Sequence, residues 1–382
     1  MGWKQLNVAP PLHALRNFAS RSRLYLRMNL PARAKSQHRI AALALGVLQG
    51  AFATAAAHAY ADSAVNPVAP VVERTFAALP NDTDAGYRSV DMHWNDAARQ
   101  RDIPVRLYWP AAASASAPVP LVVFSHGLGG SRTGYSYLGR HWASLGFASL
   151  HVQHAGSDRA VWTGNVFKLF GNLQTAASES NALDRAKDVS FAITSILDSK
   201  DFGQQINPSA IAVAGHSYGA NTAMLIGGAA VERDGKPLAL RDDRVKALIL
   251  ISAPPFTGEG DMAKILGPIK VPTLHVTGTD DVIRVPGYYS DVADRVAVFD
   301  AVASSSKLLT VFKGATHSIF TDRSAPSGVE LNSVVKKATR ELSGLFLKTV
   351  LGGASGKAID EWVVAQRALL DRSAGTLESA MR

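Results

Sequence analysis

Ser217 lies between two glycines in the stretch AVAGHSYGAN, at the spacing G-x-S-x-G. A predicted strand over residues 209–215 leads into the motif and a predicted helix over residues 220–231 follows it, which is the setting that exposes a nucleophilic serine. Gly215 and Gly219 remove side chains that would strike the neighbouring strand and helix. The motif therefore predicts covalent catalysis by Ser217, and the alternative is an ordinary tight turn.

A nucleophilic serine needs a histidine base and an acid that orients the histidine. His317 follows the last predicted strand, in GATH, and Asp280 and Asp281 end an earlier one, in TGTDD. The chain order serine, acid, histidine is the order that accompanies a nucleophile of this kind. We expect a triad of Ser217, His317 and Asp281, with Asp280 as the close alternative acid. Two less favoured acids follow the preceding strand: Glu259 and Asp261.

Hydrolysis through such a triad also needs two N–H donors for the developing oxyanion. The residue after the nucleophile supplies one, which is Tyr218, and a loop after an early strand supplies the other. The glycines of HGLGG, residues 126–130, let that loop approach a substrate closely. We assign the second donor to the N–H of Leu128 and expect His126 to hold the loop.

The elements that must position these residues alternate along the chain. Two strand-like runs, Tyr87–Trp94 and Ile103–Ala111, predict an antiparallel N-terminal hairpin. Continuous apolar runs, typical of strands covered on both faces, then occur at residues 119–126, 147–154, 209–215, 245–253, 271–278 and 307–314. Helical periodicity appears at residues 182–197 and 332–351. The pattern predicts an α/β fold with a mostly parallel central sheet and helices on both faces.

The N-terminal region differs in composition from the rest of the chain. Residues 1–61 hold eight of the 40 Lys and Arg residues and no Asp or Glu, followed within that region by the apolar run Ile40–Ala57 and small residues that contain A-x-A sites. This pattern predicts a signal peptide over residues 1–61, with Met28 as the hypothetical true start, and hence export to the periplasm or the medium. The alternative is a retained membrane anchor. Residues 62–80 read as an extended arm, and residues 81–382 as a single catalytic domain.

Charge and cysteine usage limit the partners. The formal net charge is +9, but beyond residue 61 the chain carries 32 basic against 31 acidic residues, so nucleic-acid binding has little support. The 382 residues include no cysteine, which removes disulfide and thiolate chemistry. His151 and His154 form H-x-x-H, yet residues three apart on a strand point to opposite faces, so we expect no shared metal.

Together the motifs resemble the α/β-hydrolase superfamily over almost all of the chain after the leader. HGLGGSRTGYSYLGRHWASLGF, QHAGSD, VAGHSYGAN, TGTDD and GATH are similar to the bacterial branch related to platelet-activating-factor acetylhydrolases and predicted dienelactone hydrolases. The resemblance implies an α/β-hydrolase fold, hydrolysis of small-molecule or lipid carboxylic esters, and no metal or organic cofactor. True dienelactone hydrolases use a cysteine nucleophile, which this chain lacks. Cutinases commonly carry other residues at the positions of Tyr218 and Leu128, so polyester hydrolysis is not expected.

Three questions stay open at this level. A peptidase or an acyltransferase could use the same triad, because specificity lies in the shape of the pocket. A non-catalytic binding protein on the same scaffold is less favoured. The segment Trp162–Gln174 carries several apolar residues and fits either a cap over an acyl pocket or core packing.

Overall fold

The computed structural model describes residues 86–164, 166–285, 288–323 and 328–377. The predicted signal peptide, residues 1–61, its hypothetical start at Met28 and the predicted arm, residues 62–80, lie outside the described residues. Within those residues no helix combines the length and the apolar character needed to cross a bilayer.

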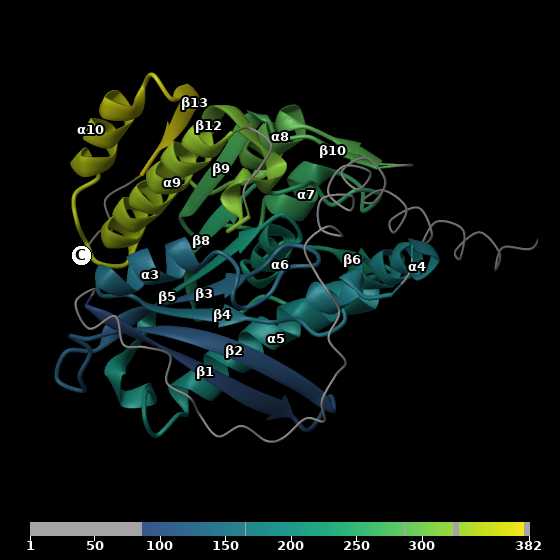
Figure 1. Cartoon of the computed structure of the whole chain (residues 1–382), viewed down its shortest axis with the longest axis horizontal. Helices are drawn as coiled ribbons and strands as arrows, with labels where there is room; N and C mark the ends of the chain where they lie inside the picture. Colours follow the sequence, from purple (N-terminus) through teal and green to yellow (C-terminus); the bar gives the residue numbers. More distant parts are fainter. Residues whose placement is uncertain (1–85, 165, 286–287, 324–327, 378–382) are drawn as a thin grey trace, which may run out of the picture. The chain divides into compact units, whose positions relative to one another are not determined.

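The described part contains one large sheet of nine strands in the order β1-β2-β4-β3-β5-β8-β9-β12-β13. Their bounds are β1 Tyr87–Asp96, β2 Arg101–Pro110, β3 Val119–Ser125, β4 Ala148–Val152, β5 Ile206–His216, β8 Val245–Ile251, β9 Thr273–Asp280, β12 Lys307–Thr316 and β13 Leu370–Thr376. The six strands from β4 to β12 are parallel, whereas β1, β2 and β13 join antiparallel. Figure 1 shows the β1–β2 hairpin at one end of the sheet and β13 at the other.

Helices cover both faces of this sheet, because its central strands bury both sets of side chains. Val123 and Leu248 point to the face covered by α5 Glu179–Leu197, α6 Tyr218–Ile226, α7 Met262–Leu266 and α8 Val292–Ala301. Val122 and Ile249 point to the opposite face, covered by α3 Ser136–Ser144, α9 Val329–Val350 and α10 Lys357–Gln366. The predicted mostly parallel sheet, its N-terminal hairpin and its two helical layers are confirmed.

Several elements differ from the sequence-based expectation. The helix predicted over residues 220–231 was wrong at its C-terminal end: α6 ends at Ile226, where Gly227 and Gly228 follow and Gly228 takes a φ of +113°. The structure adds two short hairpins, β6 Glu232–Arg233 with β7 Lys236–Pro237 and β10 Ile283–Val285 with β11 Tyr288–Ser290. It also adds the helix α4 Val166–Ala176 and the edge strand β13.

Five histidines lie inside this fold, each at most 3% exposed: His126, His151, His154, His216 and His275. Burial lowers the pKa of all five, to about 4 for His154 and to about 3 for His151, His216 and His275. An unfolded histidine has a pKa of about 6.5. Below that pH the unfolded chain binds protons that the folded chain does not, so acid destabilises the fold.

We therefore expect the free energy of unfolding to fall as the pH drops from about 6.5 toward 4. Each neutral buried histidine contributes a slope of up to about 1.4 kcal/mol per pH unit in this window. Urea unfolding followed by circular dichroism at several pH values measures the slope. His275→Gln is expected to reduce this slope by the contribution of about one proton, because it removes one of the buried histidines whose pKa is lowered. A flat profile between pH 7 and 5 would contradict the prediction.

Candidate active site

The turn between β5 and α6 holds Ser217 in an unusual backbone conformation. Its φ of 54° and ψ of −120° lie outside the regions that L-residues prefer, which costs of order 1–3 kcal/mol. The Ser217 N–H donates to the carbonyl of Ile251 on β8, at 2.9 Å, and the N–H of Ala220 donates back to the Ser217 carbonyl, at 2.8 Å. These bonds fix the turn at the carboxyl end of the parallel strands.

Two glycines let three backbones meet at this turn. A Cβ on Gly219 would lie 1.9 Å from the carbonyl oxygen of Ser125, and a Cβ on Gly215 would lie 2.1 Å from the carbonyl oxygen of Gly219. No side chain fits at these distances. The two glycines of the motif are therefore required by the close approach of β3, β5 and α6.

The structure brings Ser217, His317 and Asp281 together in one chain of hydrogen bonds. Nε2 of His317 lies 2.9 Å from Oγ of Ser217, and Nδ1 of His317 lies 2.7 Å from Oδ1 of Asp281. His317 follows β12 and begins a short 3-10 helix, while Asp281 follows β9. The three residues thus come from the ends of three parallel strands.

Asp281 is fully buried and held by three other side chains. Thr277 donates its hydroxyl to Oδ2 at 2.7 Å, and Nη2 of Arg295 on α8 lies 3.6 Å from Oδ1. Burial alone would raise the pKa of Asp281, but the charge of His317 in its protonated form, its hydrogen bond and the charge of Arg295 outweigh burial and hold the pKa below its usual range. The carboxylate is therefore ionised at neutral pH.

The other acids considered from sequence have different surroundings. Asp280 is exposed and accepts a hydrogen bond from the hydroxyl of Thr279, at 3.0 Å. Glu259 binds the guanidinium of Arg233 with both carboxylate oxygens. Asp261 accepts from the N–H of Ala263 and caps α7.

The loop after β3 lies beside Ser217 and is tightly held. Gly129 donates its N–H to the carbonyl of Ser157, at 2.9 Å, and accepts from the indole N–H of Trp162, at 2.8 Å. Nδ1 of His126, the residue expected to hold the loop, lies 2.7 Å from the carbonyl of Gly127, and its Nε2 accepts from the N–H of His154 at 3.2 Å. The backbone N–H groups of Leu128 and Tyr218 have no hydrogen-bond acceptor among the described residues. Both residues border the same pocket as Ser217.

A buried relay joins this loop to the histidine loop. The N–H of Gly127 donates to the hydroxyl oxygen of Tyr135, at 3.4 Å, and that hydroxyl donates to Nδ1 of His216, at 2.9 Å. Nε2 of His216 in turn donates to the carbonyl of His317, at 2.9 Å. Burial lowers the pKa of His216 to about 3, so the imidazole stays neutral and this donor pattern persists at neutral pH.

A second buried network, centred on Arg185, supports the loop from the α5 side. The guanidinium donates to the hydroxyls of Ser125, Ser157 and Thr222 at 2.8–3.1 Å, and also to the carbonyl of His126. It lies over the ring of Tyr218, 4.5 Å from its centre. Burial lowers the pKa of Arg185 to about 10, which leaves it charged at neutral pH.

Asp188, one helical turn after Arg185, supplies the opposite charge. It is buried and binds Arg99, Arg101 and Nδ1 of His154, each within 3.0 Å. The side chain of His154 is therefore hydrogen-bonded to Asp188. The side chain of His151 is bonded to a different residue: its Nε2 lies 3.1 Å from the hydroxyl of Ser149. In the part of the chain that the structure describes, no three His, Asp or Glu side chains are grouped to hold a metal ion.

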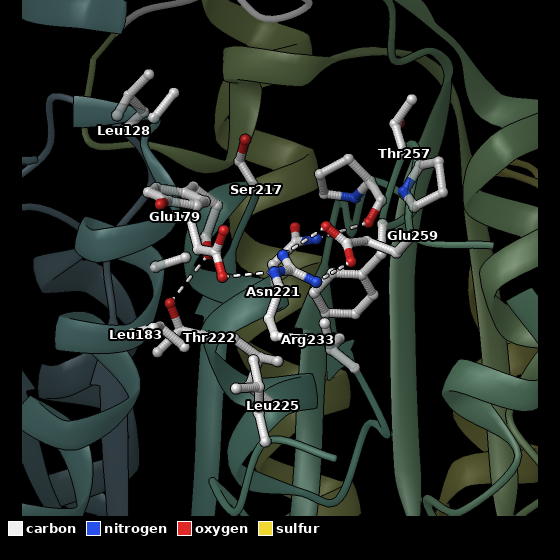
Figure 2. A pocket seen from close by; sticks show the side chains of 18 of the residues that line it. Leu128, Glu179, Leu183, Ser217, Asn221, Thr222, Leu225, Arg233, Thr257 and Glu259 are labelled. Atoms are coloured by element: carbon white, nitrogen blue, oxygen red, sulfur yellow. Dashed lines mark hydrogen bonds and ion pairs between the residues drawn. The ribbon is translucent and has the colours of Figure 1, made fainter. Parts of the chain in front are cut away.

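A pocket of about 130 Å3 opens directly beside Ser217. Figure 2 shows Ser217 and Leu128 at one end of the pocket, Leu225 at the other, and Arg233 between Glu179 and Glu259. The walls are mostly apolar: Leu183, Val231, Leu238, Pro254, Pro255 and Phe256. From the segment Trp162–Gln174, Trp162 and Leu173 belong to one apolar cluster with Leu128 and Ile283, and these last two residues line the pocket.

The fold is also found in a solved structure. A ferulic acid esterase from Streptomyces cinnamoneus superposes with a TM-score of 0.50 over 72% of this chain and 92% of that chain, at 18% identity. The chain has an α/β-hydrolase fold. A cold-adapted esterase from an Arctic intertidal metagenomic library matches less closely, with a TM-score of 0.45, 14% identity, and 66% of this chain and 94% of that chain covered.

At the sequence level this chain is similar to platelet-activating factor acetylhydrolases. Residues 100–170 match the family model described as platelet-activating factor acetylhydrolase, isoform II. The acetylhydrolase of Cavia porcellus is 26% identical over 149 residues, covering 31% of this chain and 34% of that protein. That of Bos taurus is 31% identical over 147 residues, covering 30% and 33%. The chain thus spans about a third of the length of these curated relatives, and the family match contains the loop of Leu128 but ends before Ser217.

The backbone contact at Gly219 leads to a prediction with an internal control. Gly219→Ala places a methyl group against the carbonyl of Ser125, so we expect a loss of about 3 kcal/mol or more in unfolding free energy. Gly171→Ala, on α4 with open space around the added carbon, should be neutral or stabilising by up to about 1 kcal/mol. Urea unfolding measures both. Equal stability of the two variants would contradict this account of the turn.

Proposed function

We propose that this protein is a serine hydrolase that cleaves carboxylic esters through an acyl-enzyme intermediate. The observation that carries the proposal is the continuous hydrogen-bonded line from Ser217 through His317 to the buried, ionised Asp281. The similarity to acetylhydrolases and the fold shared with an esterase support the same chemistry. The substrates are small-molecule or lipid esters.

In the first half of the reaction, Oγ of Ser217 attacks the ester carbonyl while its proton moves to Nε2 of His317. The carbonyl oxygen becomes an oxyanion and accepts from the N–H groups of Leu128 and Tyr218. When this intermediate collapses, the bond to the alcohol breaks and the alcohol oxygen takes the proton from Nε2. The acyl group remains bound to Ser217.

In the second half, a water molecule attacks the acyl carbon and gives its proton to Nε2 of His317. The second oxyanion occupies the same two N–H donors. Its collapse releases the carboxylic acid and returns the proton to Oγ of Ser217. Throughout, Asp281 accepts from Nδ1, which keeps the reactive nitrogen facing Ser217 and stabilises the imidazolium.

We further propose that the protein is exported. The basic region, the apolar run Ile40–Ala57 and the A-x-A sites that end at Ala59 and Ala61 support this proposal. N-terminal sequencing of the exported protein should find a new terminus after one of these alanines, and an intact leader would contradict it.

Ser217→Ala should lower kcat for p-nitrophenyl esters by at least about 10⁴-fold, because no other group can carry the acyl intermediate. Fluorophosphonate labelling should map to Ser217 in the wild type and vanish in the variant. Ser209→Ala, at an exposed position on β5, is the matched control and should keep both properties. Ester hydrolysis by the Ser217 variant at the wild-type rate would rule the mechanism out, and cleavage of peptide amides in preference to esters would favour a peptidase.

The two neighbouring aspartates should differ sharply. Asp281→Asn favours the wrong tautomer of His317, with the proton on Nε2 instead of Nδ1. We therefore expect kcat to fall by roughly 10³- to 10⁴-fold. Asp280→Asn changes an exposed side chain and should leave kcat close to that of the wild type. Steady-state kinetics on one p-nitrophenyl ester compares the pair. A larger loss in the Asp280 variant would reassign the acid.

A further inference from the structure

The pocket beside Ser217 contains one polar atom whose bonding the fold leaves incomplete. Asn221 lies one turn after Ser217 on α6, borders the pocket and is 9% exposed. Its Nδ2 donates to the carbonyl of Pro254, at 3.2 Å. Its Oδ1 is buried and finds no donor among the described residues.

The orientation of this amide follows from its surroundings. With the amide reversed, Oδ1 would face the carbonyl oxygen of Pro254, and two acceptors would repel each other. The carbonyl therefore holds Nδ2 and leaves Oδ1 as the free acceptor. A buried acceptor without a partner destabilises the fold, so such an atom calls for an explanation.

The position of Asn221 sets how far a partner can lie from the reacting carbon. Ser217 precedes α6 with a non-helical backbone, and the N–H of Asn221 donates to its carbonyl at 3.3 Å, so the two residues are neighbours at the pocket. An acyl chain attached to Ser217 therefore passes Asn221 within its first few carbons, and we take the third carbon as the one that carries the donor. A cavity of about 150 Å3 in another protein holds benzene, so the 130 Å3 found here suits an acyl group of about six non-hydrogen atoms.

The remaining polar groups of the pocket exclude a negatively charged partner. Arg233 donates to Glu179 and to both oxygens of Glu259, so its charge is already matched and the cluster carries a net charge of −1. Figure 2 shows these three side chains gathered at the level of Asn221. A neutral hydrogen-bond donor, such as a hydroxyl group, suits both this negative cluster and the acceptor Oδ1.

We propose that the pocket binds the acyl part of the ester and that Asn221 Oδ1 accepts a hydrogen bond from a hydroxyl group on its third carbon. The preferred substrates are then esters of short 3-hydroxy acids. The inference rests on the proposed esterase function. The acyl group is assigned to the pocket because it stays on Ser217 through both halves of the reaction, whereas the alcohol must leave and water must enter.

The test compares four p-nitrophenyl esters with the purified wild-type protein: butanoate, 3-methylbutanoate and the two enantiomers of 3-hydroxybutanoate. The methyl compound reproduces the shape of the hydroxy compound without its donor. One hydrogen bond of about 1 kcal/mol corresponds to about fivefold. After correction for the rates of hydroxide-catalysed hydrolysis, we expect kcat/KM for one hydroxy enantiomer to exceed that of 3-methylbutanoate at least fivefold.

Asn221→Leu removes the acceptor at nearly constant volume and should bring this ratio to about one. Leu225→Ala enlarges the same pocket without changing its polar atoms and should leave the ratio at its wild-type value. If the leucine variant does not fold, the wild-type ratios alone decide. Similar wild-type rates for the hydroxy and methyl esters, or a preference that survives in Asn221→Leu, would overturn the inference while leaving the esterase function intact. No hydrolysis of any ester would overturn both.

Discussion

The backbone contact of Gly219 with Ser125, closed by Gly215 behind it, is the constraint on which the site depends. It brings β3, β5 and α6 closer together than any side chain would permit. Ser217 is held in its strained conformation at this point, and the loop that carries Leu128 begins at the same place on β3. One contact thus sets the position of the serine relative to the loop, before any side chain of the site is considered.

Buried polar networks extend this control to the loops. The relay through Tyr135 and His216 joins the loop after β3 to the loop after β12, and Arg185 binds the former from the side of α5. Each group is buried and bonded, so moving either loop would leave donors or acceptors unpaired in an apolar surrounding. The networks explain how residues from separate strand ends keep hydrogen-bonding distances.

The sequence predicts most of the sheet because its central strands are continuous apolar runs between turns. It does not predict β13, whose single buried side chain is Leu370 and whose remaining residues are at least partly exposed. Asp280 and Asp281 are indistinguishable by composition, since the choice depends on which side chain turns inward after β9. Tyr135 and Arg185 were missed because residues that they bind, such as His216 and Ser125, lie far away in the chain. The signal that the sequence does offer is a charged residue beside the buried stripe of a helix, at Arg185. Arg295 was missed because the sequence does not show that α8 packs beside Asp281.

The edge strand β13 has a consequence for how activity is lost. It pairs only with β12 in the described sheet, and mostly through its backbone, so this edge is among the parts that open at the lowest free energy. β12 leads directly into His317. Loss of β13 would leave β12 paired with β9 alone and would expose the outer edge of the strand that leads to His317. Added rigidity at the C-terminal edge, rather than in the core, would then act most directly on the strand that positions the imidazole.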